Sequence, residues 1–258
     1  MICTCGMQHI VPPVQMAAMR AAPEEPARLA MFKPNRWKNR DYLHVRFLDG
    51  DTEVWRRVIA VMTGPEGWNS ACGLQCRFDQ QTPADIRITL TRGGSWSYMG
   101  DYGLPEPKPT MQLGWLDAAT PHDELRRVVL HEFGHALGFV HEALVPWASI
   151  PWNRPYIYDY YKRTNGWSKA QVDAQVFNTF AEEVVEGSAY DPTSIMTYSI
   201  PREFVLDGRY AHPAVTRLSQ TDRDKAAHWY GAPMETYVNT WLPSIQTDWN
   251  PAPGVGDA

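Results

Sequence analysis

Alternating and helical hydrophobic patterns divide the first half of the chain into short elements. Over residues 42–48 apolar side chains occupy every second position, which is typical of a strand with one buried face. Valines at helical spacing predict a helix over residues 51–62, which Gly64 and Pro65 end. Further short strands are predicted at residues 75–78, 85–90 and 110–113.

The strongest helical pattern begins near Thr120. We predict Thr120 as the N-cap with Pro121 in the first turn, and the apolar spacing then continues to Leu137. Gly138 is suited to end this helix, because glycine adopts the left-handed backbone conformation without a steric penalty. The chain is then rich in Trp, Tyr and Pro up to Trp167, and we predict irregular structure there.

Two later segments, residues 168–171 and 219–222, have the serine-led pattern of a helix start. The second is predicted to open a helix that ends at residues 230–231. The two ends of the chain show no sustained hydrophobic period, so we interpret residues 1–31 as an N-terminal pro-segment or tail and residues 233–258 as a Pro-rich tail. The predicted folded domain is therefore residues 32–232.

Composition and charge narrow the classes of protein. The 258 residues are 44% hydrophobic and 21% charged, as in ordinary globular proteins. The chain has 24 basic and 29 acidic residues, so its net charge is −5 at pH 7. Because it has no excess of positive charge to neutralise phosphates, we expect no nucleic-acid partner. No apolar run approaches the roughly 20 residues that span a bilayer. No signal peptide is visible at the N-terminus.

The four cysteines form two close pairs, Cys3 with Cys5 and Cys72 with Cys76. Four are too few for a disulfide-built scaffold at this length. A bridge between Cys72 and Cys76 needs a tight turn, since an extended stretch would separate their α-carbons by roughly 13 Å. The sequence leaves open whether they pair.

Candidate chemistry is concentrated in residues 131–141. On a helix His131 and His135 lie one turn apart on the same side, so both imidazoles can bind one ion. Glu132 is rotated by about 100° from His131, which places its carboxylate beside the open position of the ion. A continued helix would point His141 away, but a left-handed residue at Gly138 would turn the chain back and bring His141 to the ion.

Three neutral nitrogen ligands, an open position and an adjacent carboxylate are typical of a catalytic zinc site rather than a structural one. Zinc would activate a water and polarise a carbonyl group, while Glu132 would take the proton of that water and pass it to the leaving amine. The motif therefore predicts peptide hydrolysis with one catalytic Zn²⁺ and no covalent intermediate.

Residues 131–141 resemble the zinc-binding motif of the metzincin metallopeptidases, and Glu142 directly after it resembles the astacin family among them. Downstream, residues 190–198 resemble the Met-turn of these enzymes. The resemblance implies that Met196 lies beneath the zinc as an apolar floor. It also implies that Tyr198 is a loose fifth ligand or a hydrogen-bond donor to the oxyanion, a role that suits a phenol.

Upstream, residues 94–100 and 111–115 resemble the segments that precede the active-site helix in astacin-like enzymes. There the first segment is an edge strand that pairs with an extended polypeptide substrate. Trp96 and Tyr98 have an alternative interpretation as core aromatics. The candidate substrate-binding residues are Ser95, Trp96, Ser97 and Tyr98.

The resemblance implies an α+β fold of two lobes. The upper lobe would hold a twisted mixed sheet and the active-site helix, and the lower lobe would be mostly irregular with a C-terminal helix. It also implies secretion from the cell. Residues 143–147 lack the charged run that astacins carry after the glutamate, and the family's cysteine framework is not reproduced. The family's preference for acidic residues in the substrate is therefore not carried over.

The resemblance also bears on latency. In metzincin zymogens an Asp or Cys of the pro-segment occupies the open position of the zinc, so Cys3 and Cys5 are candidates for that role. Glu142 in astacins contacts the mature amino terminus. Two alternatives to the enzyme are a zinc-containing binding or adhesion module without turnover and a self-inhibited zymogen. Retention of Glu132 and Tyr198 favours the enzyme, since neither is needed to hold metal. The oligomeric state has no signature in the sequence.

Overall fold

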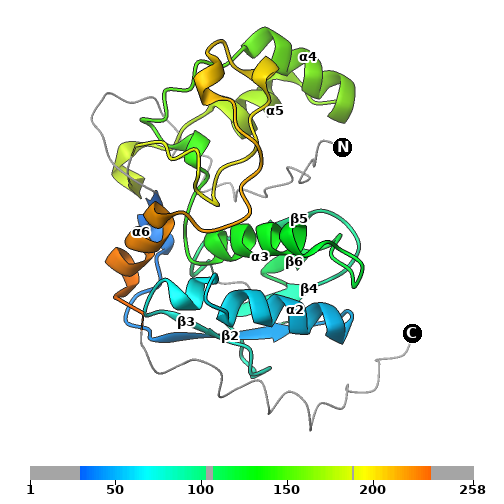
Figure 1. Cartoon of the computed structure of the whole chain (residues 1–258), viewed down its shortest axis with the longest axis vertical. Coiled ribbons are helices and arrows are strands. Elements are labelled where there is room, and N and C mark those ends of the chain that lie inside the picture. The colour runs from blue at the N-terminus through cyan, green and yellow to red at the C-terminus, as the bar shows by residue number, and fades with distance from the viewer. Residues whose placement is uncertain (1–29, 103–106, 188, 234–258) are drawn as a thin grey trace.

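A five-stranded mixed sheet organises the first half of the chain (Figure 1). The computed structural model describes residues 30–102, 107–187 and 189–233. The strands lie in the order β3-β2-β4-β6-β5, parallel except for the antiparallel pair β5–β6. Their bounds are β2 Tyr42–Phe47, β3 Gln75–Arg77, β4 Ile86–Thr89, β5 Ser95–Ser97 and β6 Met111–Leu113. The predicted α+β class and the predicted strands are confirmed.

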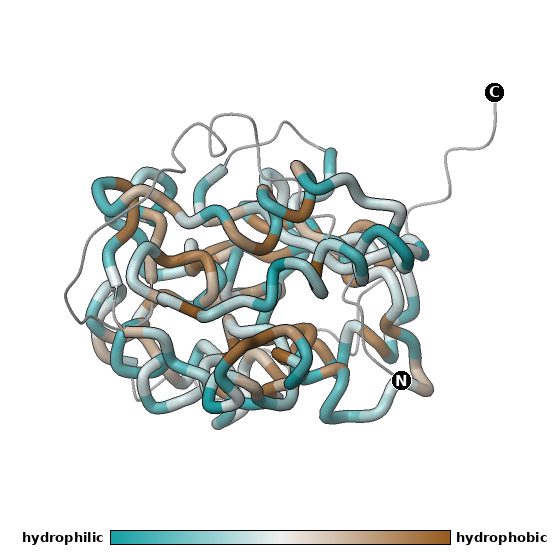
Figure 2. Tube along the Cα trace, turned by 90° about the horizontal axis from the view of Figure 1, so that it is seen from above, coloured by the Kyte–Doolittle hydropathy of each residue, from teal (hydrophilic) through white to brown (hydrophobic). Residues whose placement is uncertain are grey.

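Helices α2 (Thr52–Thr63) and α3 (His122–Ala136) pack against each other and against the sheet. We call this part the sheet lobe. Its core is built from the apolar side chains that recur along both helices and at every second position of β2, β4 and β6, on one face of the sheet. Figure 2 shows hydrophobic and hydrophilic stretches alternating along the trace. The largest fully buried side chains of this core include Trp68, Phe133, Phe139, Leu43, Ile88 and Leu113.

The start of α3 differs from the prediction. Its cap residue is Pro121, which makes no side-chain capping bond. The hydroxyl of Thr120 is bonded within its own turn instead: it accepts from the Asp117 N–H and donates to the Asp117 carboxylate, both at 2.9 Å. The predicted N-cap role of Thr120 is therefore wrong, because Asp117 takes the group that would have capped the helix.

The second lobe, residues 143–218, also departs from the prediction. A helix, α4 (Arg154–Asn165), lies where irregular structure was predicted, and Gly166 ends it in the left-handed conformation at φ 70°. Its tyrosines have modest helix propensity, so the pattern is weak. Ile157 and Tyr161 are nevertheless buried against the following helix, and this packing stabilises α4.

Both predicted serine-led helix starts are present. Ser168 forms a capping box with Gln171 at the start of α5 (Lys169–Val172), which continues into a π-helical turn over Asp173–Phe177. Ser219 forms one with Asp222 at the start of α6 (Gln220–Tyr230). Helix α6 follows the second lobe in the chain and packs back on the sheet lobe.

A short N-terminal strand is built into the fold. Strand β1 (Met31–Phe32) pairs antiparallel with β7 (Val185–Glu186) and forms a bridge to Phe139 on its other side. Ala30 and Met31, at the end of the predicted N-terminal pro-segment or tail, are both fully buried. The strand therefore lies between two segments that are far apart in the sequence.

Cys72 and Cys76 do not form a disulfide. Cys72 and Cys76 are both free thiols and buried in the sheet lobe. Burial raises the pKa of Cys72 to about 12 and that of Cys76 still further, so both stay protonated and unreactive. Cys3 and Cys5 lie outside the described residues. Among the described helices, none has both the length and the apolar character that crossing a bilayer requires.

Replacing Met31 tests whether the N-terminal strand belongs to the core. Met31→Ala removes a fully buried side chain, and we expect it to lower the free energy of unfolding by about 2–5 kcal/mol. Urea unfolding measures this. Lys33→Ala, at an exposed position two residues on, is the control and is expected to change little. Equal unfolding midpoints for the two variants would contradict the burial of Met31.

Candidate metal centre

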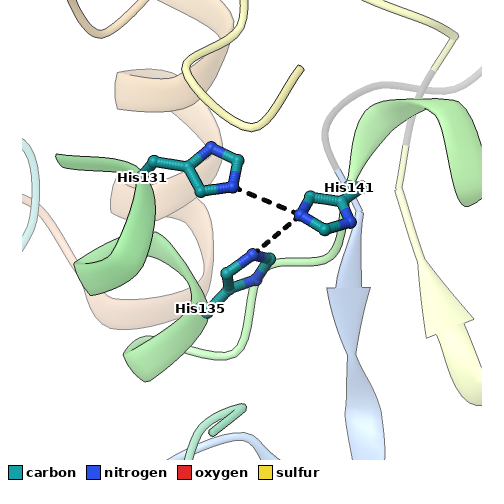
Figure 3. Close-up of side chains that lie close together, drawn as sticks. All are labelled: His131, His135 and His141. Atoms are coloured by element: carbon teal, nitrogen blue, oxygen red, sulfur yellow. Dashed lines mark hydrogen bonds between the residues drawn. The ribbon is translucent and has the colours of Figure 1, made fainter. Parts of the chain in front are cut away.

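Three histidines converge on one point (Figure 3). His131 and His135 lie on α3, and His141 comes from the loop after it. The Nε2 atom of His141 lies 3.2 Å from Nε2 of His131 and 2.9 Å from Nε2 of His135. All three side chains are buried, at 3–6% exposure. The structure thus brings together the three predicted ligands.

The backbone at Gly138 makes this convergence possible. Leu137 still has helical backbone angles, and Gly138 then turns to φ +98°, as the sequence analysis predicted. A Cβ atom there would also lie 2.7 Å from the sulfur of Met31. Glycine is therefore required twice, for its backbone conformation and for the close approach of strand β1.

The end of α3 is held by donors from other parts of the chain. Carbonyl groups in the last turn of a helix have no partner within the helix, and buried ones need partners elsewhere. Each of the four carbonyls from residue 135 to residue 138 accepts such a bond. The pairs are Gly100 N–H to His135, Trp37 Nε1–H to Ala136, Tyr230 hydroxyl to Leu137 and Phe32 N–H to Gly138.

Two backbone carbonyls orient the imidazoles. Nδ1 of His131 lies 2.8 Å from the Ile195 oxygen, and Nδ1 of His135 lies 2.8 Å from the Phe139 oxygen. A carbonyl oxygen only accepts, so each Nδ1 carries the proton and each Nε2 keeps a lone pair. Burial lowers the pKa of His135 to about 4, so this side chain is neutral near pH 7.

This donor set fits a zinc ion. Lone pairs of neutral nitrogens that face one another at close range repel, and a cation between them turns that repulsion into coordination. Tetrahedral zinc–nitrogen bonds of 2.0–2.1 Å would separate the nitrogens by about 3.3 Å, close to the 2.9 and 3.2 Å observed for His141 with its two partners. The cluster is compatible with a catalytic zinc site that keeps an open position.

Glu132 and Tyr198 lie beside this cluster. Glu132, the helical neighbour of His131, is 1% exposed, and its Oε2 atom has no hydrogen-bond partner among the described residues. Burial raises the pKa of Glu132 to about 8, although the charge of Arg127 opposes the shift; a bound cation would lower it. The Tyr198 hydroxyl lies 2.7 Å from Nε2 of His141.

Met196 and Glu142 lie next to the site without joining the cluster. Met196 is fully buried, and its sulfur occupies the space that Gly134 leaves by having no side chain. The Glu142 N–H donates to the Met196 carbonyl, and its Oε2 accepts from the Asp191 N–H at 2.8 Å. Its other carboxylate oxygen is buried and has no partner among the described residues, and burial raises the pKa of Glu142.

Three of the candidate substrate-binding residues, Ser95, Trp96 and Ser97, form β5 at one edge of the sheet, and Tyr98 directly follows it. The indole N–H of Trp96 donates to the side chain of Gln112 on the neighbouring strand, and the ring of Tyr98 stacks on that of Tyr102. Ser95 is 2% exposed, whereas Trp96, Ser97 and Tyr98 are half-buried. The turn that follows β5 is bonded to the end of α3, so this edge lies next to the histidine cluster.

Several groups at the site were not predicted from the sequence. The carbonyls of Ile195 and Phe139 set the tautomers, but backbone atoms have no residue signature. Gly134 lies within the motif at a position where the pattern allows any residue, so only its contact with Met196 reveals its role. Trp37 donates to α3 from 99 residues away in the sequence, and no local pattern predicts such a contact.

Comparisons with solved structures identify similar proteins. One structure of myroilysin matches with a TM-score of 0.74 and 34% identity, covering 80% of this chain and 100% of that one. A second matches with a TM-score of 0.56 and 34% identity, covering 76% and 86%. High choriolytic enzyme 1, a hatching enzyme zinc-protease from the medaka fish Oryzias latipes, shares the fold with a TM-score of 0.50 at 16% identity, covering 83% and 100%. No protein-family model and no curated protein sequence matches the chain.

Zinc should stabilise the folded protein through these three side chains. At free zinc about 100-fold above its Kd, mass action adds about 2.7 kcal/mol, or about 5–10 °C in Tm for a domain of this size. We expect His141→Ala to abolish most of this rise, measured by thermal unfolding with zinc and with a chelator. His122→Ala, exposed on the same helix, should keep it. An equal zinc-dependent rise in both variants would contradict the assignment of His141.

Proposed function

This chain belongs to the astacin-like family of metzincin metallopeptidases, and from that premise we propose that it is a zinc-dependent endopeptidase. The observation that carries the proposal is the convergence of the Nε2 atoms of His131, His135 and His141 on one point. Zinc bound there would supply a Lewis acid that acidifies a water and polarises the peptide carbonyl.

Glu132 is the proposed general base. Its carboxylate is buried, is one helical position from a zinc ligand and has an oxygen without a partner among the described residues. It would accept a proton as water attacks the peptide carbonyl and then donate that proton to the leaving amine. A carboxylate satisfied by structural hydrogen bonds would be less available for both transfers.

Tyr198 is the proposed donor to the developing negative charge on the carbonyl oxygen. Its hydroxyl lies at hydrogen-bond distance from Nε2 of His141, so it is already placed at the cluster. A phenol is neutral at pH 7 and can donate to an oxyanion without bringing a charge of its own. Met196, packed under Gly134, would support the cluster from below.

A polypeptide substrate would bind in extended form along β5. The outer edge of this strand has no partner strand in the five-stranded sheet, so its backbone groups are available for β-augmentation. Because the Ser95 side chain is buried, we propose that this residue contacts substrate through its backbone. Trp96, Ser97 and Tyr98 retain side-chain surface for contact.

Maturation and location follow from the same family membership. We propose that Glu142 receives the mature amino terminus, since one of its carboxylate oxygens is buried without a partner among the described residues. Cys3 or Cys5 would keep a precursor inactive by binding the open position of the zinc. We also propose that the protein acts outside the cell.

Cleavage of an unfolded protein tests the proposal. We expect the purified chain to degrade casein or gelatin, and a chelator to abolish this activity. Glu132→Gln should lower kcat/KM by at least about 100-fold because it removes the proton acceptor and leaves the histidines in place. Glu53→Gln, an equivalent change at an exposed position on α2, is the control and should cleave normally.

The alternatives give different results in the same assay. Activity that appears only after proteolytic removal of the residues before Ala30 identifies a self-inhibited zymogen. A folded, zinc-loaded protein that cleaves nothing before or after this removal is a binding or adhesion module, and that result would overturn the proposed enzyme.

A further inference from the structure

A buried carboxylate from the C-terminal helix contacts the turn beneath the histidines. Asp222 of α6 is fully buried, and its Oδ1 atom accepts from the Ser194 hydroxyl at 2.7 Å. Its Oδ2 atom accepts from the Ile195 N–H at 2.9 Å and from the Ser219 N–H at 2.8 Å. One side chain therefore joins the start of α6 to the turn of residues 194–196.

That turn is the one whose carbonyl holds a zinc ligand. The Ile195 N–H binds Asp222, and the Ile195 oxygen accepts from Nδ1 of His131 at 2.8 Å. The Ser194 hydroxyl, which donates to Asp222, also accepts from the Met196 N–H at 3.0 Å. A continuous set of hydrogen bonds thus runs from the carboxylate through the Ser194–Ile195 backbone to the imidazole.

Helix capping alone does not account for a carboxylate at this position. The other capping box among the described helices, Ser168 with Gln171, does the same work at an exposed site with a neutral side chain. Burying a carboxylate is costly unless several donors satisfy it. Of the three donors to Asp222, only Ser219 belongs to the cap, and the other two belong to the turn.

We propose that Asp222 is a positioning residue for the zinc site, acting through the backbone of Ser194 and Ile195 to fix the carbonyl that orients His131. The proposal rests on the proposed function, because it presumes zinc on the three histidines. Groups that orient metal ligands in this way change metal affinity by about 10–100-fold when they are removed. Asp222 was recognised in the sequence only as part of a helix start, and this assigns it a second role.

The test compares four variants of the full-length protein for zinc affinity, the visible spectrum with Co²⁺ in place of zinc, and Tm without metal. Asp222→Ala removes every acceptor, and we expect zinc affinity to fall by at least about 10-fold with a shifted cobalt spectrum. Asp222→Asn keeps one acceptor oxygen and should give an intermediate affinity. Ser219→Ala removes the capping hydroxyl and its hydrogen bond to the Asp191 carboxylate but leaves all three donors to Asp222 in place, and Asp224→Ala removes an exposed carboxylate on the same helix.

Ser219→Ala should lower Tm but leave zinc affinity and the cobalt spectrum unchanged. Asp224→Ala should change neither Tm, nor zinc affinity, nor the cobalt spectrum. If Asp222→Ala also lowers only Tm, its role is structural and the proposal is overturned. If Asp222→Ala does not fold, Asp222→Asn decides: weaker zinc binding than in Asp224→Ala supports the proposal, and equal binding overturns it.

The proposed peptidase function and the proposed role of Asp222 are contradicted by different results. A protein that binds zinc and cleaves no peptide contradicts the proposed function, while the Asp222 comparison still holds because it is measured by metal affinity. A protein that binds no zinc at all overturns both.

Discussion

The reversal of the backbone at Gly138 brings an imidazole from the loop to the two imidazoles of α3, and the rest of the site depends on it. A residue with a side chain would meet the sulfur of Met31 and would be strained at φ +98°. The surrounding fold holds the reversal through tertiary hydrogen bonds to the carbonyls of residues 135–138, including one from strand β1 to Gly138. The N-terminal strand, the edge of the sheet and the C-terminal helix thus meet at the point where the helix must end.

Backbone carbonyl groups orient two of the three histidines and set their tautomers. The Ile195 and Phe139 oxygens fix which nitrogen of each imidazole carries the proton, and this leaves the other nitrogen free to bind metal. Asp222 in turn binds the peptide group of Ile195. Two of the three histidines are therefore oriented by main-chain atoms, and the one that orients His131 belongs to a peptide segment held by the C-terminal helix. A site with three ligand side chains thus draws on distant elements of the chain.

Sequence patterns that are decided by neighbouring residues predicted the strands, helix starts and helix end that they mark. The alternation in β2, the two serine-led capping boxes and the helix stop at Gly138 are decided by residues a few positions apart, and the structure has all of them. The zinc motif belongs to the same class, since helical spacing and one glycine determine where its histidines point. Family resemblance added the fold, which the neighbouring structures bear out.

Features that depend on competing or distant contacts were not predictable. Thr120 has the composition of a cap, but its hydroxyl is bonded to Asp117, a competing partner three residues before it. Helix α4 is stabilised by burial against α5, which its own residues do not reveal. The burial of Ala30 and Met31 depends on segments more than 100 residues away.

The number of imidazoles on the metal decides whether the reversal at Gly138 brings His141 to the ion. Zinc K-edge X-ray absorption of the zinc-loaded protein counts them through the scattering of the imidazole rings. We expect one zinc per chain with three imidazole nitrogens at about 2.0–2.1 Å. Zinc bound by two imidazoles or fewer would contradict it.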